Sequence, residues 1–130
     1  MRKEFPYFKK GASYFPIIDV ELVGLRRSLI IKALVDSGAS FSVCQAEIGD
    51  FLEIPIEDGK PVELQGLKGK ILGYLHELPV KLRGEKFNCK IVFSRELGVS
   101  FNLLGRNNFF FPFLITFNEK HQKILIEKNQ

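Results

Sequence analysis

The chain has 130 residues, of which 45% are hydrophobic and 26% are charged. A chain of this length buries about two thirds of the surface that it exposes when unfolded, and this apolar content excludes an intrinsically disordered protein. Its 19 basic and 15 acidic residues give a net charge of +4, and they are interspersed rather than gathered in one basic stripe. We therefore expect one domain over residues 1–130 and no nucleic-acid partner.

The sequence also predicts a cytoplasmic protein that does not span a membrane. The apolar run at residues 108–115 is far shorter than the ~20 residues of a transmembrane helix. The first six residues contain no apolar stretch of the kind that a secretory signal requires. Cys44 and Cys89 are the two cysteines of the chain, and in a reducing compartment we expect both to be buried free thiols.

The first half of the chain predicts short β-strands separated by turn residues. Residues 1–15 are expected to form an N-terminal arm, in which the four basic side chains among the first ten residues stay solvated. Residues 17–23 alternate in part, and residues 29–35 are apolar enough for a strand that is buried on both faces. Residues 46–52 are capable of a helical turn or two.

The second half repeats this pattern of alternating runs and turns. Residues 61–65 alternate between apolar and polar side chains, and residues 70–82 keep this period of two for long enough to form an extended hairpin arm. Further strands are expected at residues 86–93, 101–104, 113–117 and 123–127, with a C-terminal β-hairpin over residues 113–128 and a helical turn at residues 106–110. No segment of any length has helical periodicity, so we expect an all-β, barrel-like domain without a linker.

An aspartate stands where an apolar run ends. Residues 33–40 read Ala-Leu-Val-Asp-Ser-Gly-Ala-Ser, so the backbone must turn just where Asp36 emerges. Gly38 permits this turn and a close backbone approach, and the hydroxyl of Ser37 can brace the loop by hydrogen bonding. Taken alone, the pattern is equally typical of an ordinary Asx turn.

Two later features give this aspartate a context. Residues 102–107 read Asn-Leu-Leu-Gly-Arg-Asn, and before them Gly66-Leu67-Lys68-Gly69 form a turn on the long expected hairpin. In this order, the three features resemble the retropepsins, the retroviral-type aspartic proteases, over about residues 16–111. The resemblance is better to cellular and prokaryotic single-domain members, since a further hairpin follows the Gly-Arg-Asn motif.

The resemblance implies a closed β-barrel of the retropepsin type, with one or two short helical turns, and the activity of an aspartic endopeptidase. Such an enzyme needs two facing carboxylates that share one proton, one acting as a base on water and the other polarising the scissile carbonyl. The chain has four aspartates but one Asp-Ser-Gly. A homodimer that brings together one Asp36 from each subunit is therefore required. The implied substrate is an extended peptide or protein, and no cofactor is needed.

The resemblance also assigns roles by position. Asp36 is the catalytic residue. The residues that support its loop are Ser37, Gly38, Leu103, Leu104 and Gly105. The residues that bind substrate are Gly38, Ala39 and Ser40 on the floor and Gly66, Leu67, Lys68 and Gly69 at the flap tip. The residues expected at the dimer interface are Ser37, Arg106 and Asn107. Ser40 stands where the retroviral enzymes usually have an acid that pairs with the arginine, so Arg106 lacks this expected partner.

Two other functions remain open, and no metal site is expected. His76 and His121 have no ligand spacing to either cysteine. The first alternative is a proteolytically inactive module of the same fold that dimerises or binds peptides. The second is a small basic β-barrel that binds single-stranded nucleic acid through exposed aromatic side chains.

Overall fold

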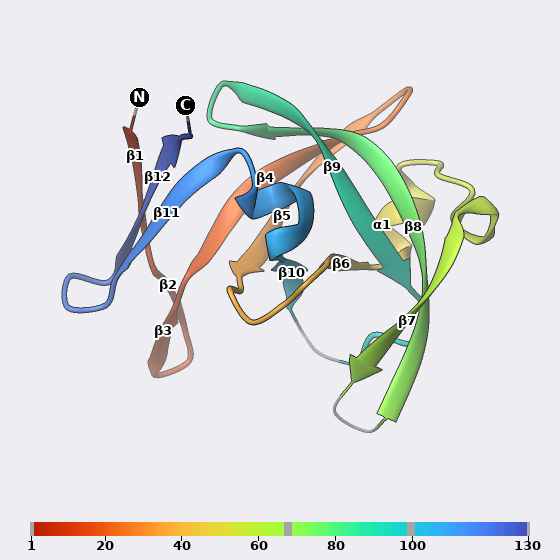
Figure 1. Ribbon diagram of the computed structural model, residues 1–130, viewed down its shortest axis with the longest axis horizontal. Coiled ribbons are helices and arrows are strands. Elements are labelled where there is room, and N and C mark those ends of the chain that lie inside the picture. The colour runs from red at the N-terminus through yellow and green to blue at the C-terminus, as the bar shows by residue number, and fades with distance from the viewer. Residues whose placement is uncertain (1, 67–68, 99–100, 130) are drawn as a thin grey trace.

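The computed structural model describes residues 2–66, 69–98 and 101–129 (Figure 1). The described strands are β1 (Arg2–Pro6), β2 (Phe8–Lys10), β3 (Ser13–Phe15), β4 (Ile17–Val23), β5 (Ser28–Val35), β6 (Ser42–Gln45), β7 (Lys60–Gly66), β8 (Gly69–Leu82), β9 (Glu85–Ser94), β10 (Asn102–Leu104), β11 (Phe113–Asn118) and β12 (Lys123–Lys128). The short helical segments are α1 (Ala46–Phe51), η1 (Ile56–Asp58) and η2 (Arg106–Phe110). The all-β fold with short helical turns is therefore confirmed.

The largest sheet closes on itself. Its strand order is β4-β5-β10-β6-β9-β8-β7, and β4 also pairs with β8 through Glu21 opposite Lys81 and Leu22 opposite Val80. Along β4 the side chains of Ile18, Val20 and Leu22 are buried while Asp19 is exposed, as expected for a strand with one face on the barrel interior. The closed barrel expected from the sequence is confirmed.

The N-terminal residues are held more firmly than the solvated arm that we expected. Strand β1 pairs antiparallel with β12, which pairs in turn with β11, so the two chain ends lie side by side (Figure 1). Phe5 and Tyr7 are buried, and the Tyr7 hydroxyl donates a hydrogen bond to Glu119 at 3.0 Å. Phe5 and Tyr7 are separated by one residue, so in an extended segment both side chains lie on the same face, which here is the face towards the core.

Three phenylalanines join this terminal sheet to the barrel. Phe109 of η2 is fully buried, and its ring lies 6.0 Å from that of Phe87 on β9 and 5.9 Å from that of Phe113 on β11.

Cys44 and Cys89 are buried free thiols. Burial raises the pKa of the Cys89 thiol to about 11 and also raises the pKa of the Cys44 thiol. None of the helices in the described part of the chain has the length and apolar character to cross a bilayer.

Replacing Phe109 with alanine is expected to lower the free energy of unfolding by about 3–5 kcal/mol, because the cavity would separate the terminal sheet from the barrel. The matched control is Phe117→Ala, since Phe117 is 37% exposed on β11 and its loss should cost about 1 kcal/mol. Urea denaturation of both variants measures the difference. Equal losses would contradict the packing role assigned to Phe109.

Candidate active site

The pairing of β5 with β10 places the two sequence motifs side by side. The strands are parallel, with Ala33 opposite Asn102 and Val35 opposite Leu104. The pairing continues one step further, because the amide of Asp36 donates a hydrogen bond to the carbonyl of Leu104 at 3.0 Å. Asp36 therefore emerges at the point where Gly105 begins the Gly-Arg-Asn segment.

The loop after β5 is a tight turn built around the Asp36 side chain. The amide of Gly38 donates to Asp36 Oδ1 at 2.9 Å, and the amide of Ala39 donates to the Asp36 carbonyl at 3.1 Å. Asp36 is half-buried, whereas Ser37 and Gly38 are exposed. This geometry is an Asx turn, in which the hydrogen bond from the Gly38 amide orients the Asp36 carboxylate.

The segment after β10 supports this loop from below. The amides of Arg106 and Asn107 donate to the carbonyls of Ala39 and Ser40 at 2.9 Å and 2.8 Å. A Cβ at Gly105 would clash with the carbonyl of Phe41 and lie 2.9 Å from that of Ala39. Residue 105 must therefore be glycine, because the two backbones approach each other too closely for a side chain.

One supporting residue was missed in the sequence. The amide of Gly105 donates to the hydroxyl of Ser42 at 3.0 Å, and Ser42 is fully buried on β6. A buried hydroxyl needs a hydrogen-bond partner, and here it satisfies the amide that β10 presents at its end. Ser42 follows a turn in a short run of its own, and nothing in its local sequence points to Gly105.

Arg106 finds a neutral partner where a carboxylate was expected. Its Nη2 atom lies 3.3 Å from Ser40 Oγ, so the serine at the acidic position still contacts the arginine. Ser37, Arg106 and Asn107, the residues predicted at a dimer interface, are all exposed and lie on two hydrogen-bonded loops. A neutral hydroxyl leaves the charge of the guanidinium uncompensated, because hydrogen bonding to serine does not neutralise it.

A cleft of about 590 Å³ lies between this loop and the β7–β8 hairpin. The hairpin extends beyond the barrel towards the lower edge of Figure 1, and its register runs to Gly66 opposite Gly69. The cleft is lined by Gly38, Ala39, Ser40, Phe41, Val43, Glu63, Leu64, Gln65, Gly66, Ile71, Leu97 and Leu103. Asp36 begins the loop next to the cleft and is not among these lining residues, whereas Gly38, Ala39 and Ser40 of the same loop form the floor.

The cleft thus brings together most of the residues that were predicted to bind substrate. Gly38, Ala39, Ser40 and Gly66 line it, and Gly69 pairs with Gly66 across the hairpin. Leu67 and Lys68 lie outside the described residues. Sequence reasoning missed the apolar residues of the wall, among them Leu64, Ile71 and Leu97. The alternation of β7 and β8 could have indicated the first two, since Leu64 and Gly66 share a strand face.

Two other aspartates of the described chain form ion pairs away from the cleft. Asp19 pairs with Lys32 at 2.9 Å, and Asp50 pairs with Arg95 at 2.9 Å. Among the residues that the structure describes, no group of three or more His, Cys, Asp or Glu side chains is arranged to hold a metal ion. The groups at or next to the cleft include the carboxylates of Asp36 and Glu63, the hydroxyl of Ser40 and backbone amides and carbonyls.

Replacing Gly105 with alanine is expected to lower the free energy of unfolding by about 2 kcal/mol or more, because a new Cβ would push the Phe41 backbone out of place. Gly98→Ala is the matched control, since nothing lies within 4 Å of a Cβ at that residue. Chemical denaturation of the two variants measures the difference. If both lose the same stability, the close approach at Gly105 does not constrain the loop.

Comparison with known proteins finds a similar fold among solved structures but no related sequence. No protein-family profile matches the chain, and no curated protein matches it. Among solved structures, the fold is similar to that of the EIAV protease complexed with the inhibitor HBY-793, with a TM-score of 0.56 and 17% sequence identity. The match covers 76% of this chain and 88% of that one. The chain therefore has a β-barrel fold of the retropepsin type.

Proposed function

We propose that two copies of this chain form an aspartic endopeptidase that hydrolyses peptide bonds by a water activated between two Asp36 carboxylates. The observation that carries the proposal is the Asp36 turn, held by the β10–η2 segment beside a cleft that the β7–β8 hairpin borders. The similarity of the fold to the EIAV protease supports the same assignment. A second chain is needed because each chain contributes one such aspartate.

The proposed reaction uses the two carboxyl groups as one acid and one base. Two carboxylates at short distance do not both stay ionised, so one of them holds a proton. The ionised Asp36 takes a proton from water, whose oxygen adds to the peptide carbonyl carbon, while the protonated Asp36 donates its proton to the carbonyl oxygen. A hydroxyl group of the intermediate then returns a proton to the Asp36 that had protonated the carbonyl oxygen. The other Asp36, which took its proton from water, protonates the amide nitrogen, and the C–N bond breaks.

The lining of the cleft favours substrates with apolar side chains. Leu64, Ile71, Leu97 and Leu103 contribute aliphatic surface, and among the described lining residues Glu63 is the one that carries a charge. A peptide lying extended in the cleft would bind between the floor at Gly38 and the hairpin, as an added strand does. We therefore propose cleavage next to aliphatic or aromatic residues.

Replacing Asp36 with asparagine is expected to reduce peptide cleavage by about a hundredfold or more while leaving the fold intact, because the amide has nearly the same shape but serves as neither acid nor base. Asp58→Asn is the matched control, since Asp58 is exposed at the end of η1, away from the cleft. Digestion of a mixed peptide library by both variants measures the effect. Activity of Asp36→Asn within about tenfold of the wild type would remove Asp36 from the mechanism.

Activity is also expected to depend on protein concentration. Below the dimer dissociation constant the rate should rise with the square of protein concentration, and above it linearly, because mass action sets the population of dimers. Adding excess Asp36→Asn chains should suppress the wild-type activity, since each mixed dimer contains a broken pair. Adding Asp58→Asn chains is the control and should not suppress it. A monomer with full activity, or activity that the Asp36→Asn chains do not reduce, would exclude the shared site.

A preserved fold with no cleavage by the wild-type protein would favour the inactive module instead. In that case, peptides with apolar side chains should still bind in the cleft, because its aliphatic lining does not depend on the carboxylates. Isothermal titration of the wild type with the same peptides distinguishes an inactive peptide-binding module from a protein that does not recognise peptides.

A further inference from the structure

The β7–β8 hairpin loses one of its neighbours at a definite residue. Strand β8 pairs with β9 from Leu82 as far as Tyr74, which lies opposite Phe93. Beyond this point Leu72 lies opposite Glu63 of β7 and has no partner on β9 in this register. The amide and carbonyl of one residue in an antiparallel strand point to the same side. The amide and carbonyl of Leu72 point away from β7, on the side where β9 no longer pairs with β8. Both groups therefore need hydrogen-bond partners other than the backbone of a paired strand.

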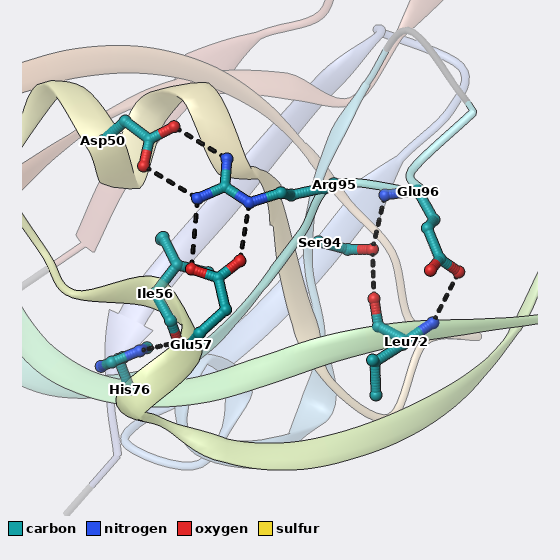
Figure 2. A network of polar contacts seen from close by, with 8 residues as sticks. All are labelled: Asp50, Ile56, Glu57, Leu72, His76, Ser94, Arg95 and Glu96. Atoms are coloured by element: carbon teal, nitrogen blue, oxygen red, sulfur yellow. Dashed lines mark hydrogen bonds and ion pairs between the residues drawn. The ribbon is translucent and has the colours of Figure 1, made fainter.

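Side chains at the end of β9 supply those partners. The Ser94 hydroxyl donates to the Leu72 carbonyl at 2.6 Å, and the Leu72 amide donates to Glu96 Oε1 at 3.0 Å (Figure 2). The Glu96 amide in turn donates to Ser94 Oγ at 3.1 Å. Ser94 is 2% exposed, so this part of the contact is shielded from water. Two side chains therefore extend the hydrogen bonding of the sheet by one residue along the hairpin.

The residue between them, Arg95, contacts the segment that leads into β7, the other strand of the hairpin. Arg95 lies between Asp50 of α1 and Glu57 of η1 (Figure 2). Its Nη1 and Nε atoms contact Asp50 Oδ2 at 2.9 Å and Glu57 Oε2 at 2.7 Å, and Nη2 contacts both carboxylates at 3.2 Å and 3.3 Å. Because η1 ends at Asp58 and β7 begins at Lys60, this bidentate contact fixes the point where the hairpin starts.

A second contact, made by His76, joins η1 to β8. The Nε2 atom of His76 lies 2.9 Å from the carbonyl of Ile56 (Figure 2). A Cβ at Gly59 would lie 2.6 Å from the carbonyl of Leu75, so the chain between η1 and β7 packs directly on β8. The two strands of the hairpin therefore leave the barrel from one fixed base.

We infer that Ser94, Arg95 and Glu96 act as a clamp on the root of the β7–β8 hairpin and set its position over the cleft. Leu97, the next residue, also lines the cleft, so a side chain that binds there contacts the segment that follows the clamp. The clamp is a property of the single chain, and its effect on catalysis rests on the proposed function. Arg95 and Glu96 are positioning residues, since they act through the hairpin.

The two ion pairs of Arg95 depend on pH. Hydrogen bonds from Arg95 hold the pKa of both Asp50 and Glu57 below their ordinary values. The contribution of these two ion pairs is therefore complete above the ordinary carboxylate pKa and is lost as the pH falls through the lowered values. His76 is a further titratable side chain that contacts η1, and its contact is with the backbone carbonyl of Ile56 rather than with a carboxylate.

Amide hydrogen exchange in the full-length protein tests the clamp without reference to activity. Glu96→Ala is expected to speed exchange of the Leu72 amide by about tenfold or more, because the amide loses its acceptor. Glu96→Gln retains a side-chain oxygen and should restore slow exchange. Amides of β8 that pair with β9, such as Val80, should exchange as in the wild type in both variants. Glu47→Ala, which removes an exposed glutamate of α1, is the control.

Arg95 is tested in the same way. Arg95→Gln is expected to speed exchange at the start of β7, and Arg95→Lys should not restore it, since an ammonium group does not bridge two carboxylates as a planar guanidinium does. Unchanged exchange at Leu72 in Glu96→Ala and at the start of β7 in Arg95→Gln would overturn the clamp. Peptide kinetics then test its consequence, which is a rise of about threefold or more in KM with a smaller change in kcat.

The outcomes separate the clamp from the proposed function. Faster exchange in the variants, together with no cleavage by the wild type, would support the clamp and remove the endopeptidase proposal. Faster exchange with an active wild type and unchanged KM would overturn the positioning role of Arg95 and Glu96. We expect Glu96→Ala and Arg95→Gln to show faster exchange and a raised KM, and Glu96→Gln to show the exchange rate and the KM of the wild type.

Discussion

The parallel pairing of β5 with β10 is the constraint on which the candidate site depends. It delivers Asp36 and Gly105 to the same end of the barrel, because each follows directly after its strand. The turn around Asp36 then fits over the β10–η2 segment only because residue 105 has no side chain. The buried hydroxyl of Ser42 satisfies the amide that this close approach leaves at the end of β10. Apart from this pairing, Asp-Ser-Gly would be an ordinary surface turn.

The floor and the hairpin of the cleft are held by different forces. Backbone hydrogen bonds between the Asp36 loop and the β10–η2 segment hold the floor, and the phenylalanine ring contacts that begin at Phe109 of η2 join the barrel to the terminal sheet. Beyond Tyr74, strand β8 of the hairpin pairs with β7 and no longer with β9. At Leu72 the side chains of Ser94 and Glu96 take the place of the backbone hydrogen bonds that β9 would supply. A rigid floor beside a less supported hairpin is a common arrangement where a ligand must enter and be covered.

Charge distribution limits what the single chain can do. Asp19 and Asp50 are engaged by Lys32 and Arg95, and in the described cleft lining Glu63 is the one acidic side chain. The proposed chemistry therefore depends on a second copy rather than on another carboxylate of the same chain. Strand β1 is paired with β12 within the chain, so this edge of β12 is already occupied in the single chain.

The sequence by itself determined the strands from β7 to β9 to within a residue or two, because their side chains alternate over long runs. It also determined the turn at Asp36 and the place where β7 ends, at Gly66, since aspartate and glycine are typical of turns. Strands β1, β2, β3 and β6, each five residues or fewer, were missed because such short runs carry no clear period. Only the tertiary structure decided that Ser42 binds Gly105, that Ser40 contacts Arg106 and that Glu96 binds Leu72. These hydrogen bonds join residues 24 to 66 positions apart, and the closure of the barrel, rather than any local spacing, brings such residues within reach.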